Sequence, residues 1–380
     1  MTDSFGQALD FLEESGLRRI RRILEGSQGA HVLVDGRRFA SYCSNDYLGL
    51  AHHPAMIEAA CEGARRYGVG AGASHLLCGH SKAHEEAERK LAEFVGLPAS
   101  VLFSTGYMAN IGAVTMLVGR NDAIFCDRLN HASLNDAAVL SRAKLYRYPH
   151  LDMEALESFL AKVGDKRKLV ATDAVFSMDG DIAPVPQLLE LCEKYDAWLL
   201  LDDAHGFGVL GEGRGILSHS GVSSPRIIYV GTLGKAAGVF GAFVAGEPGM
   251  VEMLVQRARS YIYTTAQPPL LAEAILASLD LIKTESWRRA HLHELVGYFK
   301  SKLGNSLMPS DTPIQPFPVG ENGACLNLSS RLEEKGMLVP AIRPPTVPVN
   351  RSRLRISLSA SHAFEDLDQL IAALKNEIAC

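Results

Sequence analysis

The chain has 380 residues, of which 47% are hydrophobic and 21% charged, and this balance is typical of a globular protein and excludes disordered and fibrous chains. The formal net charge of −5 gives no general attraction for nucleic acid or an anionic membrane, and no apolar run is long enough to span a bilayer. The first residues lack the basic start and apolar core of a secretory signal, so we expect a cytoplasmic protein. The length predicts two domains or one large α/β unit.

The middle of the chain alternates short apolar runs with amphipathic stretches. The apolar runs predict buried strands at 100–103, 122–126, 168–173, 198–202 and 227–230. The amphipathic stretches predict helices at 81–95, 107–117, 153–162 and 185–195. This alternation indicates a mainly parallel sheet covered by helices on both faces, and ligands of such sheets bind beyond the carboxyl ends of the strands.

From about residue 273 the pattern changes to long helices, including 287–303 and a last helix at 366–376, with β-like pieces at 324–328 and 354–358. We therefore predict an N-terminal segment (1–44) that packs on the small domain, a large α/β domain (45–271) and a small α+β domain (272–380).

The seven cysteines are scattered without a Cys-x-x-Cys pair, which argues against a disulfide framework and a thiolate zinc site. We expect most of them to be small buried apolar residues. The His80-x-x-x-His84-Glu85 pattern lacks the order of a zinc protease motif, so no metal site is predicted.

The first chemical marker is the stretch from Leu200 to Gly206, in which an apolar strand ends in Asp202 and His205 follows in a glycine-rich turn. A carboxylate at the end of a buried strand points into the ligand crevice, where it needs a positive partner. For one aspartate alone, a helix cap or turn acid is an equally good interpretation.

The second marker is Lys235, which lies among the glycines of 231–238 after a predicted strand. A P-loop is excluded because Gly231 and Gly234 are too close and Ala236 occupies the position of the magnesium-binding hydroxyl. A lysine in a tight, apolar pocket has a lowered pKa, and its free amine can form a Schiff base.

Together the two markers suit pyridoxal phosphate, which needs a lysine for its aldehyde and an acid for its ring nitrogen. The stretch Ser104–Met108 lies between a strand and a helix and can cradle a phosphate, although alone it is more simply an N-cap. His131 can stack on a flat ring, although a lone histidine is more often structural. The alternative is a dinucleotide site at Gly206–Gly211, as in a NAD-dependent dehydrogenase, but no helical stretch begins at its third glycine and the next strand lacks a ribose-binding acid.

Four motifs in order resemble those of the α-oxoamine synthases, and the resemblance extends over residues 8–376: Ser44–Leu50, Phe176–Asp181, Asp202–Gly206 and Thr232–Lys235. These are fold-type I pyridoxal-phosphate enzymes that condense an amino acid with an acyl-CoA and release CO2. The resemblance implies an α/β fold with a mainly parallel sheet sandwiched by helices and a smaller C-terminal α+β domain.

The resemblance also implies roles for single residues of the cofactor site. Lys235 would bind the cofactor covalently and then remove the Cα proton, and Asp202 would pair with the pyridinium. His205 and Ser177 would hydrogen-bond the ring's phenolic oxygen, and His131 would stack on the ring.

The remaining implied residues bind phosphate and substrate. Gly106, Tyr107 and Thr232 would bind the phosphate, and Thr264 and Thr265 would reach the phosphate of a partner subunit, which implies a homodimer with shared sites. The substrate-binding residues would be Arg355 for the amino-acid carboxylate, Asn45, His131, Thr346 and one of Arg18 and Arg19, of which Arg18 matches better. The chain departs from the usual family pattern where His75 and Leu76 follow Ser74, near the predicted acyl pocket.

Within the family, Ala341–Pro348 followed by Arg353–Arg355 is similar to the member that uses L-alanine and pimeloyl-CoA or the corresponding carrier-protein thioester. The 5-aminolaevulinate synthases share a similar Pro-Thr-Val-Pro segment but use glycine, and 2-amino-3-ketobutyrate CoA ligase is a further alternative.

Overall fold

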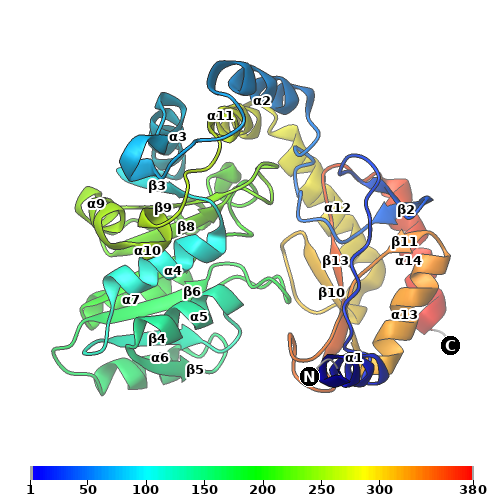
Figure 1. The fold of residues 1–380 in the computed structure, drawn as a ribbon. Helices are drawn as coiled ribbons and strands as arrows, with labels where there is room; N and C mark the ends of the chain where they lie inside the picture. Colours follow the sequence, from blue (N-terminus) through cyan, green and yellow to red (C-terminus); the bar gives the residue numbers. More distant parts are fainter. Residues whose placement is uncertain (1–2, 379–380) are drawn as a thin grey trace. The chain divides into compact units, whose positions relative to one another are not determined.

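The computed structural model describes residues 3–378, which fall into two compact units. The small unit comprises Met1–Gly49, Met178–Gly180 and His291–Cys380, and the large unit comprises Leu50–Ser177 and Asp181–Ala290 (Figure 1). The predicted boundaries at 45 and 272 lie earlier than those of the units, because α11 (Pro269–Thr284) packs against α2 (Pro54–Tyr67) in the large unit. Gly63 permits this contact, since a Cβ there would lie 2.8 Å from the Cα atom of Leu270.

The large unit is built on a seven-stranded sheet in the order β3-β9-β8-β7-β6-β4-β5. The strands are β3 (Ala99–Phe103), β4 (Ala123–Asp127), β5 (Lys144–Tyr148), β6 (Lys168–Asp173), β7 (Ala197–Asp202), β8 (Ile227–Thr232) and β9 (Ala242–Gly246). All neighbours pair in parallel except β9, which is antiparallel to both β8 and β3. The five predicted strands and the mainly parallel sheet are confirmed, whereas β5 and β9 were not predicted.

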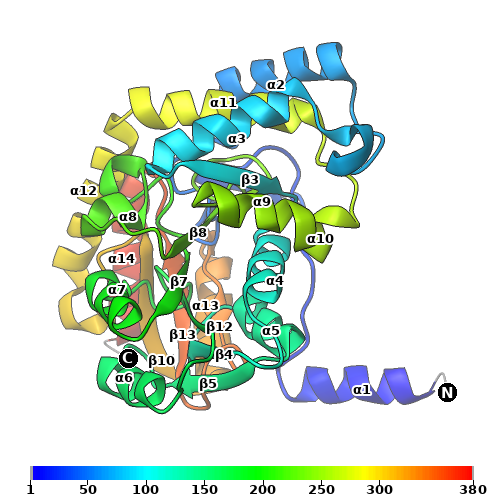
Figure 2. The same cartoon turned by 90° about the vertical axis from the view of Figure 1, so that its left-hand side faces the viewer.

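Helices cover both faces of this sheet, with α4 and α5 on one side and α6 and α7 on the other (Figure 2). These four helices are α4 (Gly106–Leu117), α5 (Ala132–Ser141), α6 (Met153–Ala161) and α7 (Val185–Lys194). Besides them and the α2 and α11 helices, the large unit contains the helical elements η1 (His75–Gly79), α3 (Lys82–Val95), η2 (Gly211–Gly213), α8 (Ile216–Ser220), α9 (Pro248–Arg257) and α10 (Arg259–Ile262). The four helices predicted in this region are confirmed to within a residue or two at each end. Apolar side chains between the layers, such as Val101, Ile124 and Leu200, are at most 1% exposed, so their burial drives the assembly of the unit.

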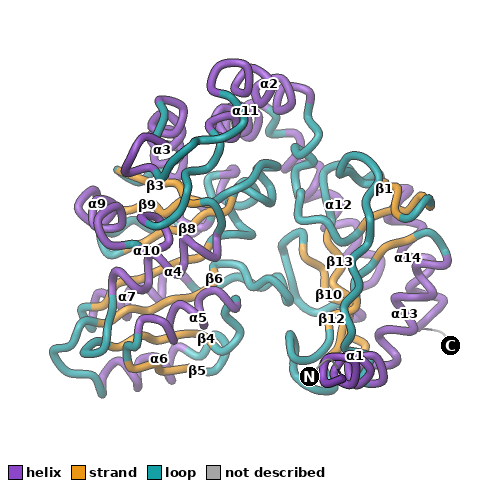
Figure 3. Tube along the Cα trace, in the orientation of Figure 1, coloured by secondary structure: helices purple, strands orange, loops and turns teal. Residues whose placement is uncertain are grey.

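The small unit contains two three-stranded sheets, β1-β2-β11 and β10-β13-β12 (Figure 3). Its strands are β1 (His31–Val34), β2 (Arg37–Ser41), β10 (Ile314–Gly320), β11 (Met337–Leu338), β12 (Ala341–Ile342) and β13 (Ser352–Ser357). Its helices are α1 (Asp3–Glu14), η3 (Gly304–Ser306), α13 (Asn322–Glu334), α14 (Phe364–Ile378) and most of α12 (Trp287–Leu303), which begins in the large unit.

One predicted element of the small unit is wrong. Residues 324–328, expected as a β-like piece, lie inside α13. The Glu321 carboxylate accepts hydrogen bonds from the backbone N–H groups of Gly323 and Ala324 and so caps this helix. The buried residues of α13 follow helical spacing, because Cys325, Leu328 and Leu332 recur every three or four positions. The predicted piece at 354–358 and the last helix are confirmed as β13 and α14.

The cysteines are less buried than predicted. Cys126, Cys192 and Cys325 are buried, but Cys43, Cys61 and Cys78 are exposed, and Cys380 lies outside the described residues. None of the helices described between residues 3 and 378 combines the length and the apolar character that crossing a bilayer requires.

Candidate active site

Three neighbouring strands of the large sheet each end in a carboxylate: β4 in Asp127, β6 in Asp173 and β7 in Asp202. Asp173 and Asp202 pair in register, so both carboxyl groups lie at the carboxyl edge of the sheet, where they are 4% and 6% exposed. Burial and the neighbouring charge of Asp202 raise the pKa of Asp173 well above its usual value.

Asp202 is held by two donors. The Asn110 Nδ2 group donates to Asp202 Oδ2 at 2.6 Å, and the backbone N–H of Ala204 donates to Oδ1 at 3.1 Å. Asn110 also donates to Ser133 Oγ at 2.8 Å, so the amide fixes the carboxylate relative to helix α5. Asn110 was not predicted as a site residue, although a polar amide within the otherwise apolar helix α4 was a usable signal.

Lys235 lies in a tight turn between β8 and β9. The backbone N–H of Leu233 donates to Gly241 O, that of Val239 donates to Leu233 O, and that of Gly238 donates to Lys235 O. The two glycines adopt positive φ angles of 67° and 109°, which favour residues without a Cβ atom. The turn thus gives the lysine one fixed backbone position.

The lysine amine meets an imidazole. Lys235 Nζ lies 3.0 Å from His205 Nε2, so the ammonium or amine can donate to the ring nitrogen. The charges of Lys235 and Asp202 both act on the pKa of His131 and on that of Asp173. Lys235 and Asp202 are therefore both close to His131 and Asp173.

His131 is the N-cap of α5, and the charges of Asp202 and Lys235 both act on its pKa. Its backbone N–H donates to Asp173 Oδ2 at 2.7 Å, and its Nδ1 is 2.7 Å from Ser133 Oγ. Burial, together with the positive charge of Lys235, lowers the pKa of His131, while Asp202 raises it. The ring is therefore neutral at pH 7, and because the residue is also exposed it can stack on a flat ligand.

The N-terminus of α4 provides an anion site at the same edge. Thr105 caps the helix through Oγ1, which accepts from Met108 N at 3.1 Å, and the N–H groups of Gly106 and Tyr107 have no acceptor within the helix. A Cβ at Gly106 would lie 3.6 Å from Thr232 Oγ1, so the hydroxyl is adjacent to these N–H groups. Backbone donors, the helix dipole and a hydroxyl suit a phosphate group.

The other residues predicted for the cofactor lie in less regular segments. Ser177 follows β6 and is half-buried, whereas Thr264 and Thr265 lie in the surface loop after α10, and Thr265 is exposed. Their roles stay predictions.

In the small unit the structure brings Arg355 and Asn45 together. Arg355, on β13, is 5% exposed and donates to Ser357 Oγ at 2.7 Å, to Asn45 Oδ1 at 3.2 Å and to the Tyr47 hydroxyl at 3.4 Å. A guanidinium can bind a carboxylate through charge-assisted hydrogen bonds. Tyr47 was quoted within a motif but not predicted as a site residue.

The remaining predicted substrate residues are exposed. Arg18 pairs with Glu13 at 2.9 Å, Arg19 is exposed, and Thr346 lies in the exposed segment after β12. The structure places none of them with Arg355.

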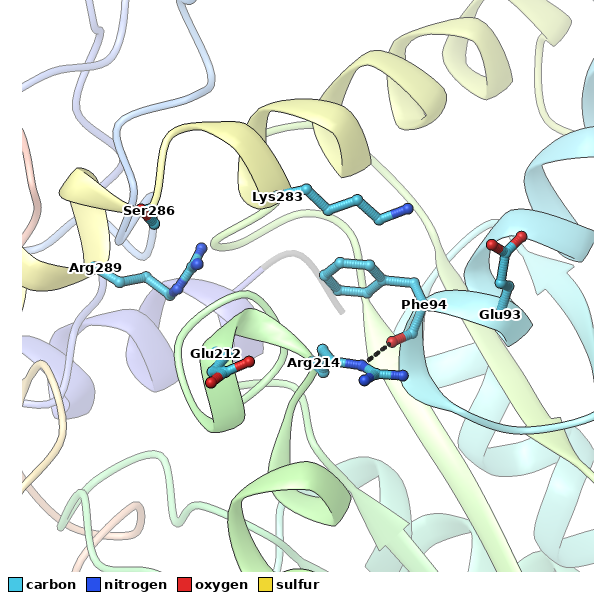
Figure 4. A pocket seen from close by; sticks show the side chains of 7 residues that line it. All are labelled: Glu93, Phe94, Glu212, Arg214, Lys283, Ser286 and Arg289. Atoms are coloured by element: carbon cyan, nitrogen blue, oxygen red, sulfur yellow. Dashed lines mark hydrogen bonds between the residues drawn. The ribbon is translucent and has the colours of Figure 1, made fainter.

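A cavity of about 670 Å³ in the large unit is lined by none of the predicted site residues (Figure 4). Its lining residues are Glu93, Phe94, Glu212, Arg214, Lys283, Ser286 and Arg289. The mixed charges of this lining favour no single ligand, and the chemistry of the chain lies at the sheet edge instead.

Comparison with known proteins identifies the family. Residues 40–374 match the aminotransferase class I and II family. The chain is 61% identical to an 8-amino-7-oxononanoate synthase of Nitrosospira multiformis, covering 96% of this chain and 94% of the relative. It is 59% identical to one of Nitrosomonas europaea over the full length of both.

Solved structures agree with this assignment. A serine palmitoyltransferase of Sphingomonas wittichii superposes with a TM-score of 0.93 at 29% identity, covering 98% of this chain and 96% of that one. An 8-amino-7-oxononanoate synthase of Francisella tularensis superposes with a TM-score of 0.79 at 30% identity, covering 90% and 98%. The predicted fold class is confirmed, and the chain belongs to the aminotransferase class I and II family and, within it, to the α-oxoamine synthases.

Proposed function

We propose that the protein is an 8-amino-7-oxononanoate synthase, a pyridoxal-phosphate-dependent acyltransferase of biotin biosynthesis. It joins the Cα of L-alanine to the acyl carbon of a pimeloyl thioester, and CO2 and the free thiol leave. The observation that carries the proposal is the single site that contains Lys235, His205 and the Asn110-bound Asp202. Full-length relatives of 54–61% identity bear the same name.

The residues of this site fit pyridoxal phosphate. Lys235 offers an amine to the aldehyde, Asp202 an acid partner to the ring nitrogen, and the start of α4 with Thr232 a cradle for the phosphate. The buried Asn110 Oδ1 has no partner among the described residues, which marks this pocket as one built for further polar contacts. When bound, the cofactor supplies an electron sink for the charge that develops at Cα.

The chain's own groups direct the protons. Asp202 is oriented by hydrogen bonds from Asn110 and the Ala204 N–H, and its carboxylate would hold a proton on the ring nitrogen of the cofactor. Lys235 Nζ, within hydrogen-bond distance of His205 Nε2, is the base that removes the Cα proton. His131, neutral in this environment, covers the ring without adding a charge.

Arg355 is proposed to bind the alanine carboxylate, with Asn45 and Tyr47 holding the guanidinium in place. A charge-assisted contact of this kind contributes about 1.5–3 kcal/mol and orients the substrate. Arg18 or Arg19 and Thr346 are proposed to contact the acyl substrate. Whether the thioester carries CoA or a carrier protein is decided by assay.

A homodimer with shared sites is proposed from the resemblance at Thr264 and Thr265, and a cytoplasmic location remains the prediction from the sequence. Sedimentation velocity of the cofactor-loaded protein tests the dimer. A monomer at micromolar concentration that retains full activity would contradict it.

A matrix of alanine, glycine and serine against acetyl-CoA, succinyl-CoA, pimeloyl-CoA and pimeloyl-carrier protein, measured by thiol release, tests the function. We expect alanine with a pimeloyl thioester to be the best pair. Release with glycine and acetyl-CoA alone would instead indicate a 2-amino-3-ketobutyrate CoA ligase, and glycine with succinyl-CoA a 5-aminolaevulinate synthase-like enzyme. Borohydride should bleach the yellow protein, and failure to do so would favour the dehydrogenase alternative.

A further inference from the structure

Three histidines of the large unit cluster outside the proposed active site. His75 lies in η1, His80 directly follows it, and His84 lies in the first turn of α3. One ring nitrogen from each lies within 4.8 Å of the others, and the ring centroids are 5.0 to 5.5 Å apart. Three imidazoles this close can offer one ring nitrogen each to the same ion.

The hydrogen bonds of the three histidines determine which ring nitrogen of each carries the proton and which carries the lone pair. His84 Nδ1 accepts from the backbone N–H of Ser81 at 3.0 Å, so the proton of His84 is on Nε2, which donates to Gln267 O at 2.9 Å. His80 Nε2 lies 3.2 Å from Glu85 Oε2, a carboxylate oxygen that only accepts. His80 therefore has its lone pair on Nδ1, 2.9 Å from Nδ1 of His75, which donates its proton there.

This pattern is that of metal-ligating histidines. Such residues donate their distal N–H to a carboxylate or a backbone carbonyl, which fixes the tautomer and turns the lone pair to the metal. His80 has the carboxylate of Glu85, and His84 has the carbonyl of Gln267. We propose that His75, His80 and His84 form a zinc site with three protein ligands, whose fourth position is taken by water.

Binding changes two details of the cluster. His75 moves its proton from Nδ1 to Nε2, so no proton is released, and the Ser81 N–H gives up its bond to His84 Nδ1. The positive end of α3 and Lys82 oppose a cation, and the Glu85 carboxylate, which lies 3.2 Å from His80 Nε2, offsets part of this charge. The half-buried Glu88 is close to both residues and accepts a hydrogen bond from the backbone N–H of Leu102.

The site joins three segments of the large unit. His75 stacks on Tyr261 of α10 at a centroid distance of 4.9 Å and an interplanar angle of 11°, and His84 is bonded to Gln267. Thr264 and Thr265 lie between these two residues. Zinc would thus hold the loop that carries both threonines against η1 and α3.

The test is a zinc titration of the tag-free, cofactor-loaded protein in competition with a chromogenic chelator, with Co²⁺ absorption as a second probe. We expect one tight site per chain, and tetrahedral Co²⁺ bands in the visible range. His80→Gln should weaken zinc binding by about 100-fold, since it removes one of three ligands. The matched controls are His219→Gln, an exposed histidine on α8, and Cys78→Ser, an exposed thiol within η1. Both should bind zinc as the unmodified chain does.

Three outcomes overturn the proposal: an unmodified chain that takes up no zinc at micromolar concentration, equal binding by the His80→Gln and His219→Gln variants, or loss of binding in Cys78→Ser. Circular dichroism shows whether His80→Gln folds, and His75→Gln replaces it if it does not. Zinc should raise the melting temperature of the unmodified chain and of His219→Gln, but not that of the folded cluster variant.

Discussion

The two units of the molecule hold their charged functional groups in different ways. In the large unit Asp202, His205 and Lys235 lie at strand ends and in the turns that follow, where the backbone is fixed by tight hydrogen-bonded turns. In the small unit Arg355 lies inside a strand and is fixed by side chains. Groups at strand ends can be recognised from short motifs, whereas a charge inside a strand depends on partners far away in the sequence.

The largest effect on turnover is expected from Lys235→Ala, in the large unit. We expect turnover to fall by at least about 1000-fold, because the variant has neither the amine that binds the cofactor nor the base. Thiol release measures the loss, and borohydride should no longer attach the cofactor covalently to the chain. Lys283→Ala, at an exposed lysine of the separate cavity, is the matched control and should keep normal turnover.

The next largest effect on turnover is expected at Asp202. Asp202→Asn should lower kcat by about 100-fold or more, since the amide cannot hold the ring nitrogen protonated. Asn110→Ala should cost about 10-fold through misplacement of Asp202 and should shift the pH profile of kcat. An Asn110→Ala enzyme with unchanged kcat and pH profile would show that the amide is only structural.

Arg353 and Arg355 on the same strand offer an internal comparison. Arg353 pairs with the carboxylate of Asp179, whereas Arg355 donates to the neutral oxygens of Ser357, Asn45 and Tyr47. Arg355→Lys should raise the KM for alanine by about 10- to 100-fold. Arg353→Ala should lower the free energy of unfolding by about 3 kcal/mol, because it leaves a partly buried carboxylate alone, without a change in that KM. If Arg353→Ala raised the KM for alanine and Arg355→Lys changed only the stability, Arg353 and not Arg355 would be the substrate-binding residue.

The smallest effect concerns pH and His150. Burial lowers the pKa of this residue, but hydrogen bonds to Asp127 and Asp181 raise it to about 9. Because the folded pKa exceeds the unfolded value of 6.5, the stabilisation is complete below pH 6.5 and is lost as pH rises through 9. We expect a loss of no more than about 3 kcal/mol in denaturant melts between pH 6 and 10. His150→Gln should flatten this dependence, and an equal slope in both proteins would assign it to other groups.

Much of the large unit could be predicted from the sequence, because continuous apolar runs identify buried strands. Strand β5 was missed since Lys144 and Arg147 interrupt its pattern at the sheet edge, and β9 since its alanines and glycine have weak strand preference. Residues 324–328 were misassigned because five apolar-rich residues fit a short strand as well as a helix, and the cap at Glu321 decides between them.

The candidate site was predictable to a similar extent. Asp202, Lys235, His205 and His131 were predicted from residue types in short motifs, and in the structure Lys235 Nζ lies 3.0 Å from His205 Nε2 while Asp202 and Lys235 both act on the pKa of His131. Asn110 was missed because its partner is 92 residues away, so only the folded sheet brings the two together. The His80-x-x-x-His84-Glu85 pattern was set aside because a protease motif order was sought, and His75 was not connected with it because only the π-helix turn brings it close.

The antiparallel pairing of β9 with β8 limits the insertions and deletions that the turn between them tolerates. Since the Leu233–Gly241 bond joins the two strands across the turn that carries Lys235, both ends of this hairpin are clamped. The turn between β8 and β9 has no spare residues to absorb an insertion or a deletion, which would therefore displace the amine of Lys235. We therefore expect the number of residues between Leu233 and Gly241 to vary less among related sequences than the residue types do.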